Sequence, residues 1–581
     1  MKTKRLFIIP LLALLMSSCA NNEIHFNSDP ASSNIATTSS QTISSSEEIA
    51  SSITSSSETS FSSDVSSSQA SSSSQKSEAS SSSARPSSSA TSSSSARSSS
   101  SARSSSSAQS SSSARSSSSA QSSSSAQSSS SSSSSQADTI VNLELFALND
   151  MHGNVYDSST GLGLTKTTTL LKTYPKNVNN ALYISQGDMW QGSAASNTTR
   201  GQLVNDWMSQ LNFTSMTMGN HEFDWTTSYV KTNSELANFP YLGINIFNRT
   251  TNKRVDYLQP STVVNKNGAK IGIIGAIGDC YSSISSSMVQ DIYFKVGDEL
   301  TTLVKNEATR LKNEEKCDFI IYSLHDDSSQ YDTSLSNGYV DLVLEGHTHK
   351  NYVDKDSYGV YHIQSAGYNK TINYINIDLN IATDTFVVKN TKSIYTNDYT
   401  SLAEDTATQA IFAKYSDIIN GTDRVVGYNR TYRSSTELKQ LVSSLYLSYG
   451  SQKWGSSYNL FLGGGYISTR KPYNLYSGDV TYADLYELFP FDNNLVLCSI
   501  SGYYLYYKFV ATDNDNYYIT YSDYGELYHN DIDFNKTYYV VTDTYSSDYA
   551  PNNLTVIDTY SDYGFYARDM LAEYISQGNF A

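Results

Sequence analysis

Cysteine is scarce in this sequence: only Cys19, Cys280, Cys317 and Cys498 occur among 581 residues. Cysteines this far apart give no framework of disulfide bonds, and no Cys-x-x-Cys pair is present to hold a structural zinc ion. We interpret the last three as small buried apolar side chains. A fold held together by disulfides or by a cysteine zinc site is therefore excluded.

Positive charge is also in short supply. Lys and Arg number 39 against 56 Asp and Glu, which gives a formal net charge of -17 at pH 7. Such a surface repels a polyanion, so we expect no nucleic acid polymer as a partner. The charge is typical of an exported protein that must stay soluble, and an anionic substrate would need a locally positive site.

Long apolar runs are absent except at the N-terminus, where Leu6–Met16 follows Lys2, Lys4 and Arg5. The run is shorter than the roughly 20 residues that span a bilayer, and it is typical of a signal peptide. The small residues before Cys19 resemble a bacterial lipobox. We expect lipidation of Cys19 and a lipid-anchored, extracytoplasmic protein; the alternative is an ordinary signal peptide in which Cys19 is incidental.

Serine dominates the next stretch, which has almost nothing apolar to bury and cannot offset the entropy of ordering. Tyrosine first appears at Tyr156 and becomes frequent after Tyr428. These shifts predict five segments: a lipoprotein signal peptide (1–19), a disordered Ser-rich linker (20–137), a first folded domain (138–400), an interdomain helix and linker (401–426) and a second folded domain (427–581).

Short apolar runs alternate with amphipathic stretches in the first predicted domain. The predicted strands are Leu143–Leu148, Leu182–Ser185, Ile271–Ile277, Phe319–Ser323 and Leu342–Leu344. Helical stretches such as Val296–Glu314 lie between several of them, which predicts a layered α/β domain. Leu402–Ile419 is expected to form one helix between the domains. The tyrosine-rich strands that follow favour a second, α+β domain.

Five polar motifs each follow a predicted apolar strand. They are Asp150-Met-His152, Gly187-Asp188, Gly219-Asn220-His221-Glu222-Phe-Asp224, Ser323-Leu-His325 and Gly346-His347-Thr-His349. Ligands collect where the strands of an open α/β sheet end, so these motifs are expected to converge. They hold five of the eight histidines in the chain.

The residue types in these motifs suit two divalent cations that share one ligand. Oxygen from Asp and Asn, nitrogen from His and no thiolate fit Zn²⁺, Mn²⁺, Co²⁺ or Fe. Asp188 is placed to bridge, because a carboxylate has two oxygens. Asp150 and His152 are two residues apart on a loop that leaves a strand, so both can face one ion. His347 and His349 have the same spacing and are expected to point the same way.

The motifs as a set resemble the calcineurin-like metallophosphoesterase superfamily. Phe-Ala-Leu-Asn-Asp-Met-His-Gly-Asn-Val (146–155) and Gly-Asn-His-Glu-Phe-Asp (219–224) look like its secreted bacterial 5′-nucleotidase branch. The resemblance implies a four-layer α/β fold, a β-sandwich flanked by helices, followed by a C-terminal α+β nucleotidase domain. It also implies two divalent metal ions as cofactors.

The resemblance further implies roles for individual residues. The first metal would be held by Asp150, His152, Asp188 and His349. The second would be held by Asp188, Asn220, His325 and His347. His221 would stabilise the transferring phosphoryl group or protonate the leaving oxygen. Asp224 would orient His221, unless it is a capping or surface carboxylate; Asp326 and Asp327 are the rivals of His325.

In the nucleotidase branch the C-terminal domain binds the nucleotide, so the resemblance implies that residues 138–400 form the catalytic domain and residues 427–581 the substrate-binding domain. Similar motifs here imply that the substrate is bound by Arg433, Gly464, Arg470, Phe491, Tyr545 and Asp548. Phe491 and Tyr545 would stack on the two faces of the base, because stacking makes no demand on base identity. Core packing is the alternative role for both rings.

The expected reaction is release of phosphate from 5′-nucleotides by a metal-activated hydroxide, in a protein expected to be a monomer. Two close alternatives are a 2′,3′-cyclic nucleotide phosphodiesterase and a nucleotide-sugar hydrolase, since the metal site contacts only the phosphoryl group. An alternative of another class is a surface binding protein or adhesin. The resemblance also implies domain rotation, with the helix Leu402–Ile419 as the hinge region.

Overall fold

The computed structural model describes residues 139–467, 469–470, 474–511, 517–549, 553–560 and 565–580. The predicted signal peptide with Cys19 and the Ser-rich segment lie outside the described residues. Within those ranges, every helix is too short or too polar to cross a lipid bilayer.

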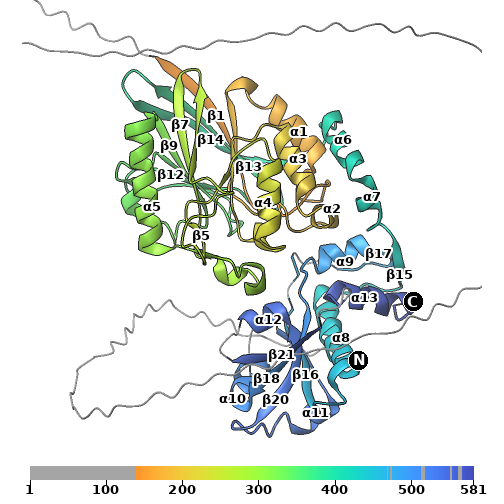
Figure 1. Cartoon of the computed structure of the whole chain (residues 1–581). Helices are drawn as coiled ribbons and strands as arrows, with labels where there is room; N and C mark the ends of the chain where they lie inside the picture. Colours follow the sequence, from red (N-terminus) through yellow and green to blue (C-terminus); the bar gives the residue numbers. More distant parts are fainter. Residues whose placement is uncertain are drawn as a thin grey trace, which may run out of the picture. The chain divides into compact units, whose positions relative to one another are not determined.

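Two six-stranded sheets form the first half of the described chain (Figure 1). One has the order β14 (Thr385–Tyr395), β13 (Thr371–Asn380), β1 (Ile140–Leu148), β2 (Ala181–Ser185), β3 (Ser215–Thr217), β4 (Tyr241–Leu242). The other has the order β11 (Tyr352–Lys355), β12 (Tyr361–Gln364), β10 (Leu342–Glu345), β9 (Phe319–His325), β7 (Ala269–Ile277), β6 (Ser261–Lys266). The strands from β1 to β4 run parallel, as do β12, β10, β9 and β7.

The two sheets pack face to face through alternate residues of their strands. Leu143 and Leu145 of β1 share one buried cluster with Ile271 of β7 and Ile321 of β9. Phe146, which follows Leu145, belongs to a different cluster, on the outer face of its sheet. Side chains alternate between the two faces of a strand, so strands covered on both faces are apolar at most positions. This double burial accounts for the continuous apolar runs in the sequence.

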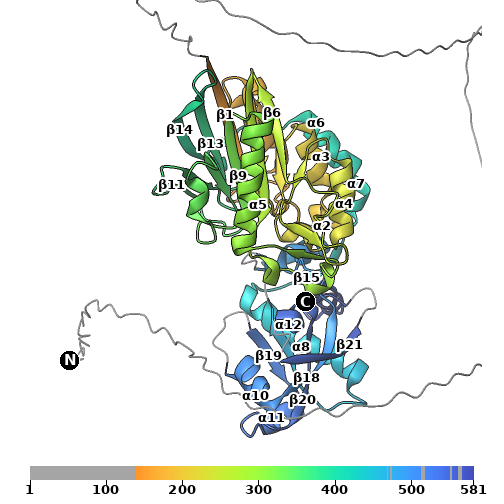
Figure 2. The ribbon, with the colours of Figure 1, turned by 60° about the vertical axis from the view of Figure 1, so that its left-hand side comes forward.

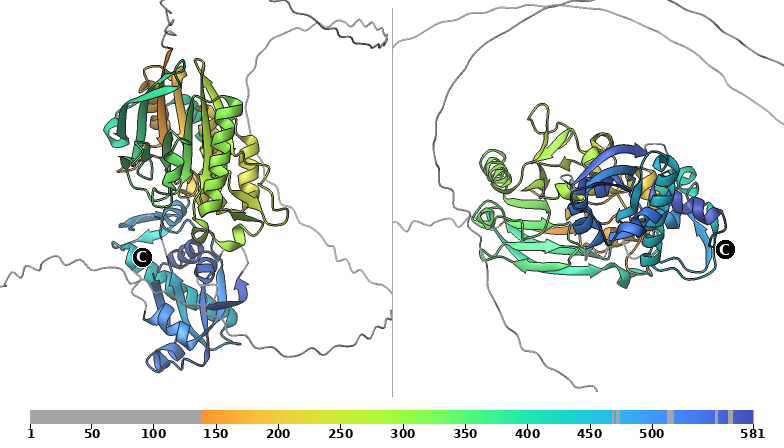
Figure 3. Two further views of the ribbon diagram at one scale, coloured as in Figure 1. Left: turned by 90° about the vertical axis from the view of Figure 1, so that its left-hand side faces the viewer. Right: turned by 90° about the horizontal axis from the view of Figure 1, so that it is seen from below.

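Helices cover the outer face of each sheet (Figures 1 and 2). The first is covered by α1 (Leu164–Thr173), α2 (Ala194–Thr198), α3 (Gln202–Gln210) and α4 (Thr227–Leu236). On the second, Val304 and Ala308 of α5 (Gly297–Arg310) pack with Ile320 of β9. The lime-green α5 lies outside the green strands in both views of Figure 3. The predicted sandwich flanked by helices is confirmed.

All five predicted strands are present, with β1 and β7 starting earlier and β9 running on to His325. The predicted helix Val296–Glu314 is α5 followed by a π-helical turn at Leu311–Glu315. A short antiparallel pair, β5 (Ile246–Asn248) and β8 (Ile292–Phe294), completes the strands of this half.

The prediction of one helix over Leu402–Ile419 is wrong. Two helices, α6 (Thr406–Lys414) and α7 (Ser416–Asn420), meet at Tyr415, whose φ of -104° and ψ of 9° interrupt the helix. Tyr415 turns inward instead, and its hydroxyl donates to Asp206 Oδ2 at 2.9 Å. Tyr415 and Ile419 belong to the core of the first half. The segment therefore packs on the first domain, and the chain leaves that domain only after Asn420.

The second half contains a five-stranded sheet. Its order is β19 (Tyr517–Tyr521), β16 (Leu460–Tyr466), β20 (Thr537–Asp543), β18 (Leu495–Ser501), β21 (Leu554–Tyr560). A separate pair joins β15 (Val425–Asn429) to β17 (Gly478–Thr481). The helices are α8 (Ser435–Trp454), α9 (Tyr482–Leu488), α10 (Gly502–Leu505), α11 (Asp523–Tyr528), α12 (Thr544–Tyr549) and α13 (Ala567–Ser576). This arrangement agrees with the predicted α+β domain.

The three described cysteines are buried and free. Burial raises the pKa of the Cys498 thiol to about 12, so that side chain stays protonated and unreactive at neutral pH. The sequence-based interpretation of Cys280, Cys317 and Cys498 as small buried side chains agrees with the structure.

Asp405 joins α6 to the first domain. Its Oδ1 accepts the Thr408 N–H at 2.9 Å as a helix N-cap, and its Oδ2 accepts from Lys172 of α1 at 2.7 Å. Burial alone would raise the pKa of Asp405, but these bonds, led by that of Lys172, lower it to about 2.

We therefore predict that Asp405→Ala lowers the free energy of unfolding by about 1–2 kcal/mol at pH 7, because a cap and a surface ion pair are lost. The folded-state pKa lies below the unfolded value of about 4, so this contribution is present above pH ~4 and is lost as the pH falls toward 2. Urea unfolding curves at pH 7 and at pH 3 measure it. Asp405→Asn keeps the capping acceptor and should lose only the part that depends on pH; equal stability of wild type and Asp405→Ala at pH 7 would contradict the prediction.

Candidate metal centre and active site

The carboxyl ends of β1, β2, β3, β9 and β10 bring the five polar motifs to one edge of the sandwich. Hydrogen bonds join the loops of the two sheets there. The His347 N–H, after β10, donates to Asp150 Oδ2, after β1, at 2.8 Å. His325 Nδ1, at the end of β9, lies 2.6 Å from the carbonyl oxygen of Gln186, after β2. The sheet-to-sheet packing thus fixes the side chains of one motif against those of another.

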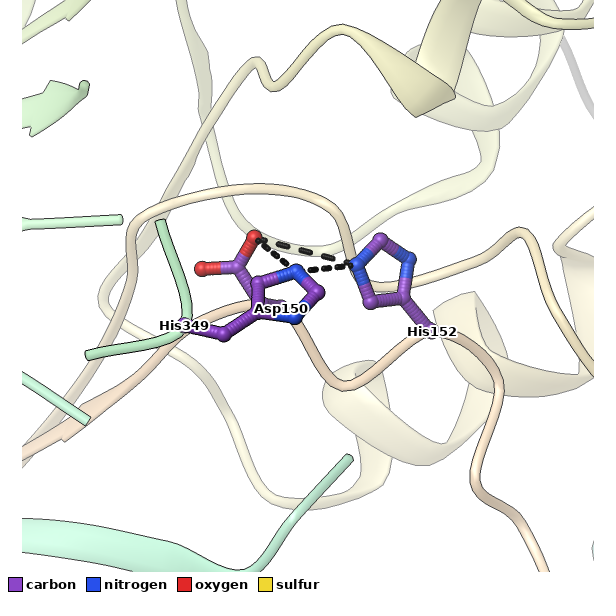
Figure 4. A group of neighbouring side chains, drawn as sticks. All are labelled: Asp150, His152 and His349. Atoms are coloured by element: carbon purple, nitrogen blue, oxygen red, sulfur yellow. Dashed lines mark hydrogen bonds and ion pairs between the residues drawn. The ribbon is translucent and has the colours of Figure 1, made fainter. Parts of the chain in front are cut away.

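One group of potential metal ligands comprises Asp150, His152 and His349, whose ligand atoms all lie within 4.8 Å of one another (Figure 4). Asp150 Oδ1 is 3.3 Å from His349 Nε2 and 3.8 Å from His152 Nε2. The two imidazole Nε2 atoms are 2.9 Å apart. Three potential ligand atoms therefore point to one place.

A second group comprises Asp188, His325 and His347. His325 Nε2 is 3.4 Å from Asp188 Oδ2. Asn220 completes it, because its Oδ1 lies 3.1 Å from His325 Nε2 and 3.0 Å from His347 Nδ1. Asp188 Oδ2 also lies 3.9 Å from His152 Nε2 of the first group, so this carboxylate stands between the two groups.

The donor set fits divalent cations. Asp150 Oδ1 is buried and has no hydrogen-bond partner among the described residues. A buried acceptor without a donor costs free energy that a cation would offset. Two nitrogens and one or two carboxylate oxygens per group are ligands that Zn²⁺, Mn²⁺, Co²⁺ and Fe accept. All seven predicted metal ligands thus lie in these two groups.

Backbone strain marks the same residues. The φ angles are 51° at Asp150, 48° at His152, 54° at Asp188, 72° at His347 and 56° at His349. Residues with a Cβ rarely adopt this left-handed conformation, and such strain persists only where the surroundings hold it. Packing within the sandwich therefore holds these five residues in a strained backbone conformation that directs their side chains inward.

Burial and mutual charge shift the pKa values in the centre. Burial lowers the pKa of His152 well below its usual value, and Arg470 adds to this effect. Burial would raise the pKa of Asp188, but His325 and its neighbours outweigh that and lower it. Conversely, Asp188 overcomes the effect of burial on His325 and raises its pKa to about 10. Asp188 is thus held as a carboxylate, the form that binds metal.

Glu222, for which the motifs predicted no ligand role, organises the loop that carries Asp188. Its Oε2 accepts the N–H groups of Asp188 and Gly219, and its Oε1 accepts that of Met189, each at 2.8 Å. Burial and the charge of Asp188 raise its pKa to about 8. One buried carboxyl group therefore ties the loop after β2 to the loop after β3.

His221 and Asp224 form a pair beside the second group. His221 Nδ1 lies 2.8 Å from Asp224 Oδ2, and the His221 N–H donates to Asp188 Oδ1 at 2.8 Å. His221 Nε2 is 3.3 Å from Arg470 Nη1. Since Arg can only donate, Nε2 is the acceptor and the ring proton lies on Nδ1, facing Asp224. Asp224 is therefore placed to orient the His221 ring.

A cavity of about 220 Å³ opens beside this pair, lined by His221, Asp224, Arg470, Phe491 and Tyr545 among others. Arg470 reaches from the second half toward the metal groups, and its Cζ lies 5.1 Å from the centroid of the Phe491 ring. Its guanidinium also donates to Gln191 Oε1. Phe491 and Tyr545 line a cavity that adjoins the metal centre, which is a position suited to a ligand.

Three predicted substrate residues do not line this cavity. The Arg433 guanidinium lies 3.9 Å from the Phe580 ring centroid, and its Nε donates to Asn429 at 3.2 Å. Gly464 lies within β16 with a φ of 133°, where a Cβ would come 2.0 Å from the carbonyl oxygen of Tyr518 in β19. Its lack of a side chain therefore serves the pairing of two strands.

Asp548 is the third. Its Oδ2 accepts from Ser285 Oγ at 2.9 Å and from the Ser286 N–H at 3.0 Å, both in the first half of the chain. Ser285 lines the cavity. Asp548 therefore binds a residue of the cavity wall and does not itself line the cavity.

Sequence reasoning missed Gln191 and a charged cluster around Asp492. Gln191 lies three residues after Asp188, so a motif extended from Gly187-Asp188 to residue 191 would have included it. Asp492 accepts from Arg200 of the first half at 2.8 Å and from the buried Arg568 of the second half. Arg568 is distant in sequence from every motif, so only the fold reveals this contact.

Residues 144–351 match the family model described as calcineurin-like phosphoesterase. The chain carries a calcineurin-like phosphoesterase domain. It is therefore a phosphoester hydrolase, and the resemblance drawn from the motifs is confirmed. The family implies divalent metals, in agreement with the two groups of ligands in this domain.

The similarity to known proteins extends beyond the phosphoesterase domain. Protein UshA of Yersinia enterocolitica is 25% identical over 427 residues, which cover 63% of this chain and 75% of that protein. A 5′-nucleotidase of Vibrio cholerae is 23% identical over the same shares of each chain. The structure of a 5′-nucleotidase precursor from Thermus thermophilus aligns with a TM-score of 0.58 at 17% identity, over 75% of this chain and 96% of that one. The last match shows that both halves of the fold are shared.

For the Glu222 contacts, we predict that Glu222→Gln weakens metal binding by about 10–100-fold, as substitutions of groups that support metal ligands do. The new amide NH₂ faces one of three N–H donors and cannot accept from it. Equilibrium dialysis with Mn²⁺ measures the affinity. Glu235→Gln, on the exposed face of α4, is the control and should bind like the wild type. Unchanged affinity in Glu222→Gln would show that the loop holds its shape without this carboxyl group.

Proposed function

We propose that the protein is a two-metal phosphohydrolase that releases phosphate from 5′-nucleotides outside the cytoplasm. The observation that carries the proposal is the cavity lined by Phe491 and Tyr545 beside His221 and the two metal groups. A base between two aromatic side chains and a phosphate at adjacent cations would place both ends of a nucleotide. The similarity to 5′-nucleotidases supports the same substrate class.

Asp150, His152, Asp188 and His349 would hold one ion, and Asp188, Asn220, His325 and His347 the other. When bound, the two ions would supply Lewis acidity to the phosphoryl oxygens and acidify a water molecule for attack on phosphorus. Asp188 would serve both ions, because its carboxylate stands between the groups and its lowered pKa keeps it ionised.

His221 would contact the phosphoryl group through Nε2. With Nδ1–H directed at Asp224, the ring is held in one tautomer and orientation. A proton taken up at Nε2 would then be available to the phosphoryl or leaving oxygen, and Asp224 would stabilise the resulting cation.

Arg470 and Gln191 would bind substrate oxygens. Arg470 Nε and Gln191 Nε2 are buried donors without a hydrogen-bond partner among the described residues. Buried donors are normally paired, so an anionic ligand in the cavity would satisfy them. Arg470 also supplies the local positive charge that an acidic protein needs to attract a nucleotide.

A second candidate function is hydrolysis of a phosphodiester, either a cyclic nucleotide or a nucleotide sugar. Another cavity, of about 270 Å³, adjoins the metal centre and is lined by His152, Tyr368, Arg470 and Glu487 among others. Arg470 lines both cavities, so a substrate with substituents on both sides of its phosphate could occupy the two together.

We also propose that Cys19 carries a lipid anchor, that residues 20–137 form a tether, and that the folded part acts as a monomer outside the cell. The basic and apolar N-terminus and the Ser-rich composition support this placement. Palmitate labelling that persists in Cys19→Ser would contradict the anchor.

The proposed nucleotidase activity is tested by phosphate release after chelation and readdition of Mn²⁺, Zn²⁺ or Co²⁺. The substrates are AMP, a 2′,3′-cyclic nucleotide, a nucleotide sugar and an aryl phosphate. We expect metal-dependent release from AMP well above that from the aryl ester. His221→Ala should lower kcat by about 100-fold or more while metal binding persists, because a preorganised charge partner of the phosphoryl group is lost.

The aromatic pair has its own test. Phe491→Ala should raise KM for AMP about tenfold, since stacking on a base contributes about 1–3 kcal/mol, and should leave the aryl ester little changed. Phe534→Ala removes a half-exposed phenylalanine elsewhere in the second half and is the matched control.

In the substrate panel, release from the cyclic ester or the sugar nucleotide alone would favour the second candidate function. No release from any substrate would favour a binding protein.

A further inference from the structure

The buried side-chain amide of Gln364 accepts hydrogen bonds from the residues on either side of the predicted metal ligand His349. Gln364 ends β12 and is fully buried beside β10. Its Oε1 accepts from Thr348 Oγ1 at 2.9 Å and from the Lys350 N–H at 3.0 Å. Thr348 and Lys350 are the two neighbours of His349. A single oxygen atom therefore fixes the chain on either side of that histidine.

The loop needs such a support. His347 and His349 both have left-handed φ angles, 72° and 56°, which side chains with a Cβ rarely adopt. Strain of this kind persists only when several contacts hold it. The His347 N–H is held by Asp150 Oδ2 at 2.8 Å, so the first half of the loop is anchored on the opposite sheet. Gln364 anchors the second half, around His349.

A chain of hydrogen bonds fixes which end of the amide faces the loop. Gln364 Nε2 donates to the Tyr352 hydroxyl oxygen at 3.2 Å, and that hydroxyl donates to Glu345 Oε2 at 2.8 Å. Glu345 Oε1 lies 3.1 Å from His362 Nδ1. A carboxylate only accepts, so Tyr352 must donate to Glu345 and accept from Gln364. The amide oxygen is thereby left to face Thr348 and Lys350.

We propose that Gln364 is a positioning residue for the first group of metal ligands, and that Tyr352 and Glu345 set the direction of its amide. It acts on His349, which belongs with Asp150 and His152, whereas His347 of the second group is held from the opposite sheet. The inference rests on the proposed two-metal function. It goes beyond that function by assigning the control of one of the two ions to a residue that does not ligate it.

The test is a count of metal ions in the purified full-length protein. Mn²⁺ binding is measured by equilibrium dialysis with atomic absorption for wild type, Gln364→Leu and Tyr352→Phe. Wild type should bind two ions. Gln364→Leu should weaken one of the two sites by about 10–100-fold, as loss of a group supporting a metal ligand does, and leave the other near the wild-type affinity. Excess Mn²⁺ should restore kcat, because no reacting group has been removed.

Tyr352→Phe leaves Gln364 in place but frees its amide to turn, so it should weaken the same site by a smaller factor. The double variant should bind no more weakly than Gln364→Leu, since Tyr352 acts only through Gln364. Tyr361→Phe makes the same substitution at the start of β12, outside the hydrogen-bonded chain, and should bind like the wild type.

Retention of both tight sites in Gln364→Leu and in Tyr352→Phe would overturn the inference, and so would equal weakening of both sites in either variant. If Gln364→Leu failed to fold, Tyr352→Phe would decide alone, with selective weakening of one site in favour and wild-type binding against. A wild-type protein that bound no metal would refute the two-metal function itself. Two ions in the wild type, with unaltered variants, would refute only the role of Gln364.

Discussion

Face-to-face packing of two sheets is the constraint on which the active site depends. Leu143 and Leu145 on one sheet and Ile271 and Ile321 on the other fill the space between them. This burial sets the distance between the carboxyl ends of β1 and β10, and so the distance between Asp150 and His347. The 2.8 Å bond between these two residues is possible only because the apolar core has already fixed both strands. The site's polar geometry is therefore a consequence of hydrophobic packing.

In the metal centre, loops with a strained backbone are held by hydrogen bonds to buried side chains. Five of the seven predicted metal ligands have left-handed backbone conformations, and buried acceptors lie beside the loops that carry them. Glu222 accepts three N–H groups around Asp188, and Gln364 accepts two donors around His349. Neither residue belongs to the two groups of potential ligands, yet each holds a loop that carries one of those ligands. Their loss is expected to act through affinity before it acts on stability.

The second half contributes through a few long side chains. Arg470 extends to His221 and Gln191, while Asp492 contacts Arg200 of the phosphoesterase domain. Phe491 and Tyr545 line the cavity between these contacts. The metal groups lie wholly within the first domain, whereas the cavity beside them is lined by residues of both halves.

The sequence by itself determined the layered α/β fold, the family and the types of ligand, because these depend on local patterns: apolar runs buried on both faces and polar motifs at strand ends. It did not determine where the helix over Leu402–Ile419 breaks, because the buried Tyr415 decides that through a contact with Asp206. It predicted Arg433 as a substrate ligand and gave no sign that this side chain packs on Phe580, and it could not find Glu222, Gln364 or Arg568 as supporting residues. Their roles depend on partners that come from other strands and loops, and only the tertiary structure brings those partners within hydrogen-bonding distance.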